Sequence, residues 1–144
     1  MGTPQFEPAI SLEGNNETLH IVDMGNPHAV MCVDNINTAP VNTLGPTIET
    51  HAHFPAQTNV GFFERVNEQH IKLRVHERGA GETKACGSGA CAAAAVMQKF
   101  YEGAPHIQVD LLGGKLTIDW QGDNATLMMT GPAEFVYEGK LLNL

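Results

Sequence analysis

The sequence predicts an α+β fold in which an antiparallel or mixed sheet curls around one buried central helix. Runs of β-branched and aromatic residues alternate with short turn sequences along most of the chain, and strands joined by tight turns pair antiparallel. One alanine-rich segment, 87–100, interrupts this pattern. It is apolar on nearly every side until Gln98, which indicates a helix buried all round rather than an amphipathic surface helix.

The first half of the chain predicts two hairpins separated by a less regular region. The expected strands are 18–24 and 29–33, joined by a turn at 25–28, and 59–66 and 71–77, joined by the polar residues 67–69. In the irregular region between the hairpins, Pro40 and Pro46 each suit the first turn of a short helix, and Gly45 separates them.

The second half predicts a loop, the buried helix and a further set of strands. Residues 78–85 are polar and glycine-rich, which is typical of a loop, and they lead into the helix at 87–100. The strands expected after the helix are 107–112, 115–120, 125–130 and 135–137.

The composition is that of one globular domain, 1–144. Hydrophobic residues make up 42% of the chain and charged residues 17%, against about 25% charged in an average protein. The net charge of -8 argues against nucleic acid and anionic membrane surfaces as partners. No apolar run approaches the about 20 residues that span a bilayer, and no secretory signal is visible. Three cysteines without disulfide spacing predict free thiols in a reducing, cytoplasmic compartment.

The segment 77–90 places Cys86 where the buried helix is expected to begin. The first N–H groups of a helix have no internal partners, and the helix dipole adds partial positive charge there, so we expect the pKa of Cys86 to be lowered. Gly87 and Gly89 let the backbone approach a bound carboxylate. The alternative is a small buried cysteine whose Gly and Ser neighbours serve only as caps. Cys91 lies deeper in the helix and is expected to be structural.

Four separated blocks closely resemble the diaminopimelate epimerase family, in the family's order. They are MGNPHAV at 24–30, TNVGF at 58–62, ERGAGET at 77–83 and ACGSGA at 85–90, and the segments 1–8 and 131–139 are also similar to the family. The resemblance implies an isomerase of lysine and peptidoglycan-precursor biosynthesis that interconverts LL- and meso-2,6-diaminopimelate without pyridoxal phosphate, another cofactor or a metal. It also implies two similar halves, each a sheet around a central helix, with one catalytic cysteine from each half.

By the same resemblance, Cys86 matches the catalytic cysteine of the second half, and Glu77 and His28 match residues that assist proton transfer. The positions that match substrate-binding residues are Asn26, Asn59, Glu77, Arg78, Gly87 and Ser88. Without the resemblance, His28 would be interpreted as a turn histidine, the two asparagines as turn or strand-edge residues, and Glu77 with Arg78 as a surface ion pair.

The resemblance also indicates what this chain lacks. The family's other half, with its own catalytic cysteine, is absent, and Cys32 falls in a predicted strand and matches no catalytic position. We therefore expect the chain to be the C-terminal half of a two-domain, homodimeric enzyme and to be inactive alone. Residues 132–144 are expected to pair with the missing N-terminal half.

Three other interpretations remain open. A cysteine-dependent hydrolase would pair Cys86 with one of the seven histidines. A proline racemase or a phenazine-biosynthesis isomerase would share the expected fold. The pattern G-x-G-x-x-A at 87–92 fits a dinucleotide fingerprint, but that fingerprint requires a strand running directly into the first glycine within a parallel βαβ unit. His51 and His53 offer two metal ligands without a third, so no metal site is predicted.

Overall fold

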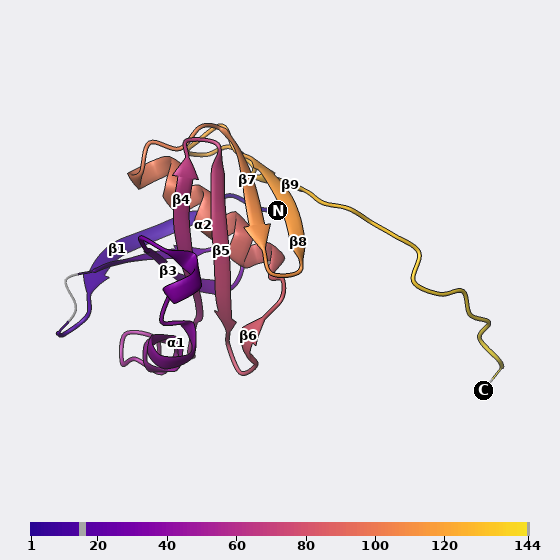
Figure 1. Cartoon of the computed structure of the whole chain (residues 1–144), viewed down its shortest axis with the longest axis horizontal. Helices are drawn as coiled ribbons and strands as arrows, with labels where there is room; N and C mark the ends of the chain where they lie inside the picture. The colour runs from indigo at the N-terminus through magenta and orange to yellow at the C-terminus, as the bar shows by residue number, and fades with distance from the viewer. Residues whose placement is uncertain (15–16, 144) are drawn as a thin grey trace.

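The structure, a computed structural model, describes residues 1–14 and 17–143, which form a nine-stranded mixed sheet with two α-helices (Figure 1). The strands are β1 (Gln5–Ser11), β2 (Thr18–Asp23), β3 (Pro27–Cys32), β4 (Asn59–Asn67), β5 (His70–Glu77), β6 (Gly81–Thr83), β7 (His106–Leu111), β8 (Gly114–Asp119) and β9 (Met128–Thr130). The helices are the short 3-10 helix η1 (Ile36–Thr38), α1 (Val41–Glu49) and α2 (Gly87–Phe100). The spatial order is β1-β2-β3-β4-β5-β7-β8-β9, with β6 beside the end of β5.

Two pairs of neighbouring strands run parallel, and this makes the sheet mixed. β3 is parallel to β4, and β5 is parallel to β7, whereas the other pairs are antiparallel. The chain between β3 and β4 contains α1, and the chain between β5 and β7 contains α2, because parallel neighbours need a crossover connection. The hairpins expected from the turn sequences are present as β2–β3, β4–β5 and β7–β8.

The two helices pack on opposite faces of the sheet. Side chains alternate between the faces along a strand, so Val22 and Val30 pack with α2, whereas Ile21 and Ala29 pack with α1. Helix α2 is buried throughout Gly89–Met97 and contacts β2, β3, β4, β5, β7 and β8. In Figure 1, β4 and β5 pass in front of it. Among the described residues, no helix is both long and apolar enough to cross a membrane.

The irregular region between the first two hairpins forms one α-helix after η1, so the helix start expected at Pro40 is confirmed and the second one expected at Pro46 was wrong. Pro40 is the N-cap of α1, but Pro46 lies inside the helix, where it removes one backbone hydrogen bond. Gly45 has a packing role: a Cβ added there would lie 2.9 Å from both Cβ and Cγ of His76. This glycine therefore lets β5 lie close against α1.

Three further sequence expectations were wrong. The segment 78–85, expected to be a loop, contains β6, which pairs with β5. Strand β1 was not predicted, because Pro8 and a register shift between Glu7 and Ile10 obscure its alternation. Residues 135–137, expected to form a strand, have no secondary structure. A strand needs a neighbour for its backbone groups, and in the described part of the chain this segment has none.

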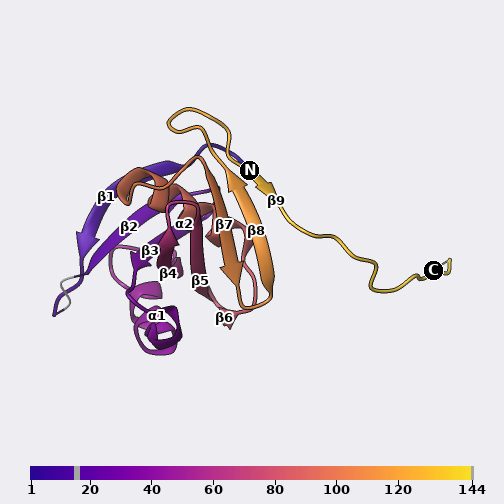
Figure 2. The ribbon, with the colours of Figure 1, turned by 45° about the horizontal axis from the view of Figure 1, so that its top comes forward.

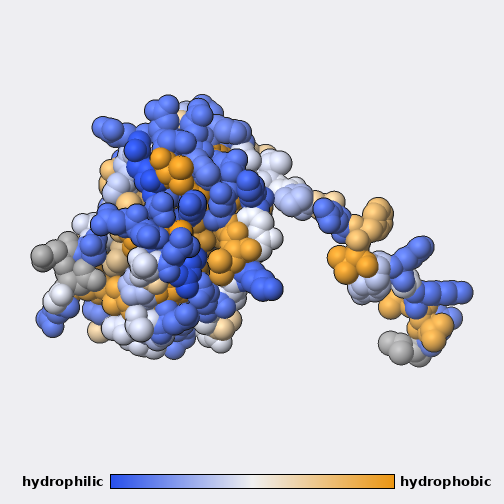
Figure 3. Space-filling view, viewed as in Figure 1, coloured by the Kyte–Doolittle hydropathy of each residue, from blue (hydrophilic) through white to orange (hydrophobic). Residues whose placement is uncertain are grey.

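Residues 131–143 extend away from the sheet as a tail without secondary structure (Figure 2). Its apolar side chains are almost fully accessible: Phe135 is 106% exposed and Leu141 is 97% exposed. Figure 3 shows these apolar residues of the tail well separated from the body of the molecule. A tail this apolar is unusual on a folded surface and is typical of an interaction segment.

Candidate functional site

The register of three neighbouring strands brings three of the predicted site residues onto one face of the sheet. His28 of β3 is paired with Asn59 of β4. Val60 is paired with His76 of β5, so Glu77 follows one position further along, next to Asn59. All three lie on the face covered by α2, since the next residues along their strands, Ala29 and Val60, pack on the opposite face with α1.

Cys86 is the N-cap residue of α2, as the sequence predicts. Its backbone is extended, and its Sγ accepts a hydrogen bond from the Gly89 N–H at 3.3 Å. The Ser88 hydroxyl lies 3.8 Å from the same sulfur. Cys86 thus occupies the position that Ser, Thr, Asp or Asn usually holds at a helix start. The residue is half-buried.

The pKa of the Cys86 thiol is raised, and the expectation of a lowered pKa was wrong. Burial disfavours the thiolate more strongly than the Gly89 N–H and the Ser88 hydroxyl favour it, and the carboxylate of Glu77 raises the pKa further. Residue order places Cys86 at the helix terminus but does not show how strongly the thiol is desolvated or how close Glu77 lies. At neutral pH the resting group is therefore the thiol.

His28 connects the start of β3 to the start of α2. Its Nε2 lies 3.1 Å from Asn26 Oδ1 and 3.1 Å from Ser88 Oγ. Asn26 Nδ2 donates to the same Ser88 oxygen at 3.2 Å. Burial lowers the pKa of His28 to about 4, so the ring is neutral at pH 7. With the proton on Nε2, His28 donates to Asn26, and the Ser88 hydroxyl is then able to donate towards Cys86.

Asn59 holds the backbone of Arg78 in place. Its Oδ1 accepts the Arg78 N–H at 2.9 Å, and its Nδ2 donates to the Pro27 carbonyl at 3.1 Å. The Arg78 guanidinium itself is exposed and donates to the Ala56 carbonyl at 3.3 Å. The backbone of Arg78 is therefore fixed while its positive charge remains available to an anion.

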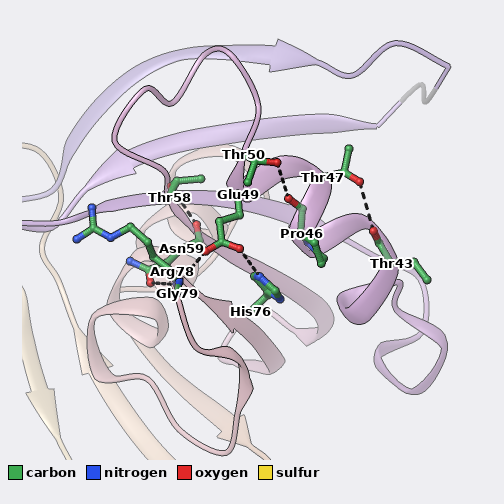
Figure 4. A network of polar contacts seen from close by, with 10 residues as sticks. All are labelled: Thr43, Pro46, Thr47, Glu49, Thr50, Thr58, Asn59, His76, Arg78 and Gly79. Carbon is green, nitrogen blue, oxygen red and sulfur yellow. Dashed lines mark hydrogen bonds and ion pairs between the residues drawn. The ribbon is translucent and has the colours of Figure 1, made fainter.

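Two residues that the sequence analysis did not select also hold this part of the structure. The Thr83 hydroxyl, on β6, donates to Glu77 Oε1. Glu49, the last residue of α1, accepts the Gly79 N–H at 2.6 Å and lies 2.8 Å from His76 Nε2 (Figure 4). Thr83 belongs to the family-like block 77–83 and could have been found there, whereas Glu49 lies in the irregular region and carries no sequence signal.

The predicted residues therefore form two groups at one edge of the sheet. Cys86, Ser88, His28 and Asn26 are connected by side-chain contacts, and Glu77 is close enough to act on the Cys86 thiol. Asn59 and Arg78 form the second group. Gly87 lies beside Met129 of β9, because a Cβ added to this glycine would be 3.2 Å from the thioether.

Among the described residues, the two other cysteines stand outside the side-chain contacts that surround Cys86. Cys91 is buried inside α2, and burial raises its pKa to about 11. Cys32 ends β3, where burial and the nearby Asp34 raise the pKa of its thiol. All three cysteines are free thiols, as the sequence predicts.

The geometry gives little support to a cysteine-dependent hydrolase, a dinucleotide-binding site or a metal site. In residues 1–14 and 17–143 no histidine is hydrogen-bonded directly to Cys86, and His28 reaches it only through Ser88. The dinucleotide fingerprint needs a parallel βαβ unit, and β5 and β7 are parallel, but β6 separates β5 from Gly87, so no strand runs from β5 directly into the first glycine. The same described residues contain no group of three potential metal ligands, and His51 Nδ1 accepts the His53 N–H instead.

Comparison with known proteins identifies a family by sequence. A family model described as diaminopimelate epimerase matches residues 20–136. The diaminopimelate epimerase of Ectopseudomonas mendocina (strain ymp) is 48% identical over 156 residues, covering 98% of this chain and 56% of that protein. That of Legionella pneumophila (strain Corby) is 55% identical over 139 residues, covering 94% of this chain and 50% of that protein. The chain thus spans about half the length of the curated relatives it matches.

Solved structures share the fold at much lower identity. A hydroxyproline epimerase from Agrobacterium vitis superposes with a TM-score of 0.59 at 14% identity, covering 88% of this chain and 46% of that one. A phenazine biosynthesis protein of the PhzF family from Bacillus anthracis gives a TM-score of 0.55 at 14% identity, covering 89% and 39%. At such identities the similarity concerns the fold alone.

Proposed function

This chain belongs to the diaminopimelate epimerase family, and we propose that it forms the C-terminal half of an isomerase that interconverts LL- and meso-2,6-diaminopimelate. In this proposal 1–144 is one domain, and the active site lies between it and an N-terminal half. Each half is a sheet curled around one helix, and the whole enzyme is a homodimer that serves lysine and peptidoglycan-precursor biosynthesis. The single observation that carries the proposal is a half-buried cysteine at the N-cap of a buried helix, within a chain of polar contacts.

Inversion at an α-carbon needs a base on one face of the carbon and an acid on the other, so one thiol cannot do both. We assign Cys86 to one face. The burial of Cys91 and the strand position of Cys32 support assigning the second thiol to the missing half. No cofactor or metal takes part in this scheme, because the two thiols and the hydrogen-bond donors of the site carry the proton transfers.

The neighbours of Cys86 would help the sulfur to change charge. The Gly89 N–H and the Ser88 hydroxyl stabilise a thiolate, and neutral His28 keeps Ser88 oriented through Asn26. A substrate ammonium group beside Glu77 would offset the negative charge that raises the pKa of Cys86. In the resting state the thiol is ready to donate a proton, and bound substrate would bring its pKa closer to neutral pH.

The polar groups around Cys86 suit a diamino dicarboxylate. The N–H groups of Gly87 and Ser88, at the positive end of α2, would hold the carboxylate next to the reacting carbon. The exposed guanidinium of Arg78, with Asn26 and Asn59, would bind the far end of the substrate. The exposed tail supports a partner: we propose that 132–144 pairs with the N-terminal half, which would cover Phe135 and Leu141.

The test is α-proton exchange and inversion of LL-diaminopimelate in deuterated water. We expect no turnover by this chain alone and turnover by a mixture with a separately made N-terminal half. In that mixture Cys86→Ala should lower the rate by about 10²–10⁴-fold, the range for losing a general acid or base. Cys32→Ala is the matched control, since it removes another half-buried thiol and should keep the activity.

Turnover by the chain alone would refute the two-half proposal. An inactive mixture, with association of the halves shown by size-exclusion chromatography, would refute the assigned reaction. Equal losses in Cys86→Ala and Cys32→Ala would remove Cys86 from the reaction. Trapping of an acyl group on Cys86 by ester substrates would favour the hydrolase instead.

A further inference from the structure

Two residues of α1 that helix preferences disfavour, Gly45 and Glu49, both contact His76. Gly45 is a poor helix former in the middle of α1, and its missing side chain makes room for His76. Glu49 is a negative charge at the helix C-terminus, where the dipole favours a positive one. Neither choice benefits the helix, so their explanation lies in what His76 and Glu49 do together.

Glu49 uses both carboxylate oxygens on partners outside its helix. Oε2 lies 2.8 Å from His76 Nε2, and Oε1 accepts the Gly79 N–H at 2.6 Å. Figure 4 shows the carboxylate between these two residues. The side chains of His76 and Glu49 are only 8% and 12% exposed, so solvent competes weakly for either bond. The Gly79 N–H also lowers the pKa of Glu49, which keeps the carboxylate charged.

The turn that Glu49 binds contains Arg78, which forms the second group of the candidate site together with Asn59. The Ala80 N–H bonds the Glu77 carbonyl at 3.1 Å, and Gly79 has φ +74, so the chain reverses directly after β5. Two consecutive N–H groups of the turn are bound by side chains from separate elements: that of Arg78 by Asn59 and that of Gly79 by Glu49. The backbone of Arg78 is thus held from both β4 and α1.

We propose that Glu49 is a positioning residue of the active site, which fixes the turn after β5 so that Glu77 and Arg78 face the substrate. That Glu49 fixes the turn is inferred from its contacts alone. That this affects substrate binding rests on the proposed function. Glu49 touches neither Cys86 nor the substrate in this scheme. Losing it should therefore weaken substrate binding more than the chemical step.

The experiment compares Glu49→Ala, Glu49→Gln and a control in the complemented two-half enzyme. Asp110→Asn is the matched control, because Asp110 lies 2.8 Å from His70 at the other end of β5 and does not touch the turn. We expect Glu49→Ala to raise KM by about tenfold while kcat stays within about twofold. Glu49→Gln keeps an oxygen for the Gly79 N–H and should raise KM by about threefold or less. Asp110→Asn should leave both constants unchanged.

A second measurement separates the contact from the function. In this chain, hydrogen exchange of the Gly79 amide should become at least about tenfold faster in Glu49→Ala than in the original chain or in Asp110→Asn. Unchanged exchange would overturn the inference whatever the kinetics. Faster exchange with KM unaltered, or equal kinetic losses in Glu49→Ala and Asp110→Asn, would overturn the positioning role. An inactive original mixture combined with faster exchange would refute the proposed reaction while supporting the contact.

Discussion

The two helices of this protein each place a residue near the candidate site, but they differ in composition and in burial. Helix α2 consists largely of strong helix formers, is buried from Gly89 to Met97, and presents Cys86 at its N-terminus. Helix α1 contains Gly45 and Pro46, has no side-chain N-cap bond, and buries only Val41, Gly45 and Ile48. Its C-terminal Glu49 acts on the Arg78–Gly79 turn through a hydrogen bond.

The two helices are therefore stabilised in different ways. Propensity and burial both favour α2, so its N-terminus is a rigid support for a reactive group. Local preference does not favour α1, so tertiary contacts with β4, β5 and β6 must hold it. The proposed catalytic thiol lies at the start of α2, and the proposed positioning residue, Glu49, lies at the end of α1.

The strongest challenge to this comparison is to place a leucine on each helix, at a buried position of α2 and at an exposed position of α1. Ala93 is fully buried in α2, so Ala93→Leu should destabilise the chain by about 3 kcal/mol or more through overpacking. Thr43 is exposed on α1, and Thr43→Leu should change the stability by no more than about 0.5 kcal/mol. Urea unfolding of both variants measures the difference. Similar losses would mean that the two helices are equally packed.

Acid should remove the stabilising contributions of His28, beside the start of α2, and of Glu49, at the end of α1, over different pH ranges. The folded pKa of His28 is about 4 and lies below its unfolded value, so between about pH 6.5 and 4 only the unfolded state gains this proton. Stability should therefore fall by up to about 3 kcal/mol as the pH drops through that range. The pKa of Glu49 is also lowered, so its contribution is present above the unfolded pKa of a glutamate and is lost at still lower pH.

His28→Asn isolates the histidine contribution, because burial also lowers the pKa of His20 and that residue adds to the same slope. Urea unfolding midpoints of both proteins between pH 4 and 8 give the comparison. A slope that is unchanged in His28→Asn would show that His28 is not buried in the neutral form.

Replacing Gly45 by alanine should lower the stability of the protein, although the same change usually stabilises a helix. Gly45→Ala should stabilise a typical helix by up to about 1 kcal/mol. Here the new Cβ would lie 2.9 Å from two atoms of His76, so we expect destabilisation by about 1–2 kcal/mol. Thr47→Ala, at an exposed position of α1, should instead stabilise by about 0.5 kcal/mol. Melting temperatures measured side by side test this reversal, and a stabilised Gly45→Ala would show that α1 does not pack closely on His76.

The sequence by itself determined the features that depend on neighbouring residues. Helix α2 begins and ends where its composition predicts, at 87 and 100, and β4 and β5 form the hairpin expected from two strand-like runs joined by polar residues. The motif blocks were sufficient to identify the family, and they contain Cys86, Ser88, His28 and Asn26, which the structure joins through side-chain contacts. Short-range preferences and motifs are recorded locally in the chain, so reading them needs no coordinates.

Tertiary structure alone decided the rest, because those features depend on which distant segments meet. The parallel pairing of β3 with β4 and of β5 with β7 joins segments that no turn connects directly. Residues 135–137 have strand-like composition and remain unpaired among the described residues. Glu49 contacts His76 and Gly79 across distant parts of the chain, and the pKa of Cys86 is raised because burial outweighs the helix terminus. Desolvation and long-range contacts are properties of the packed molecule, and residue order alone does not measure them.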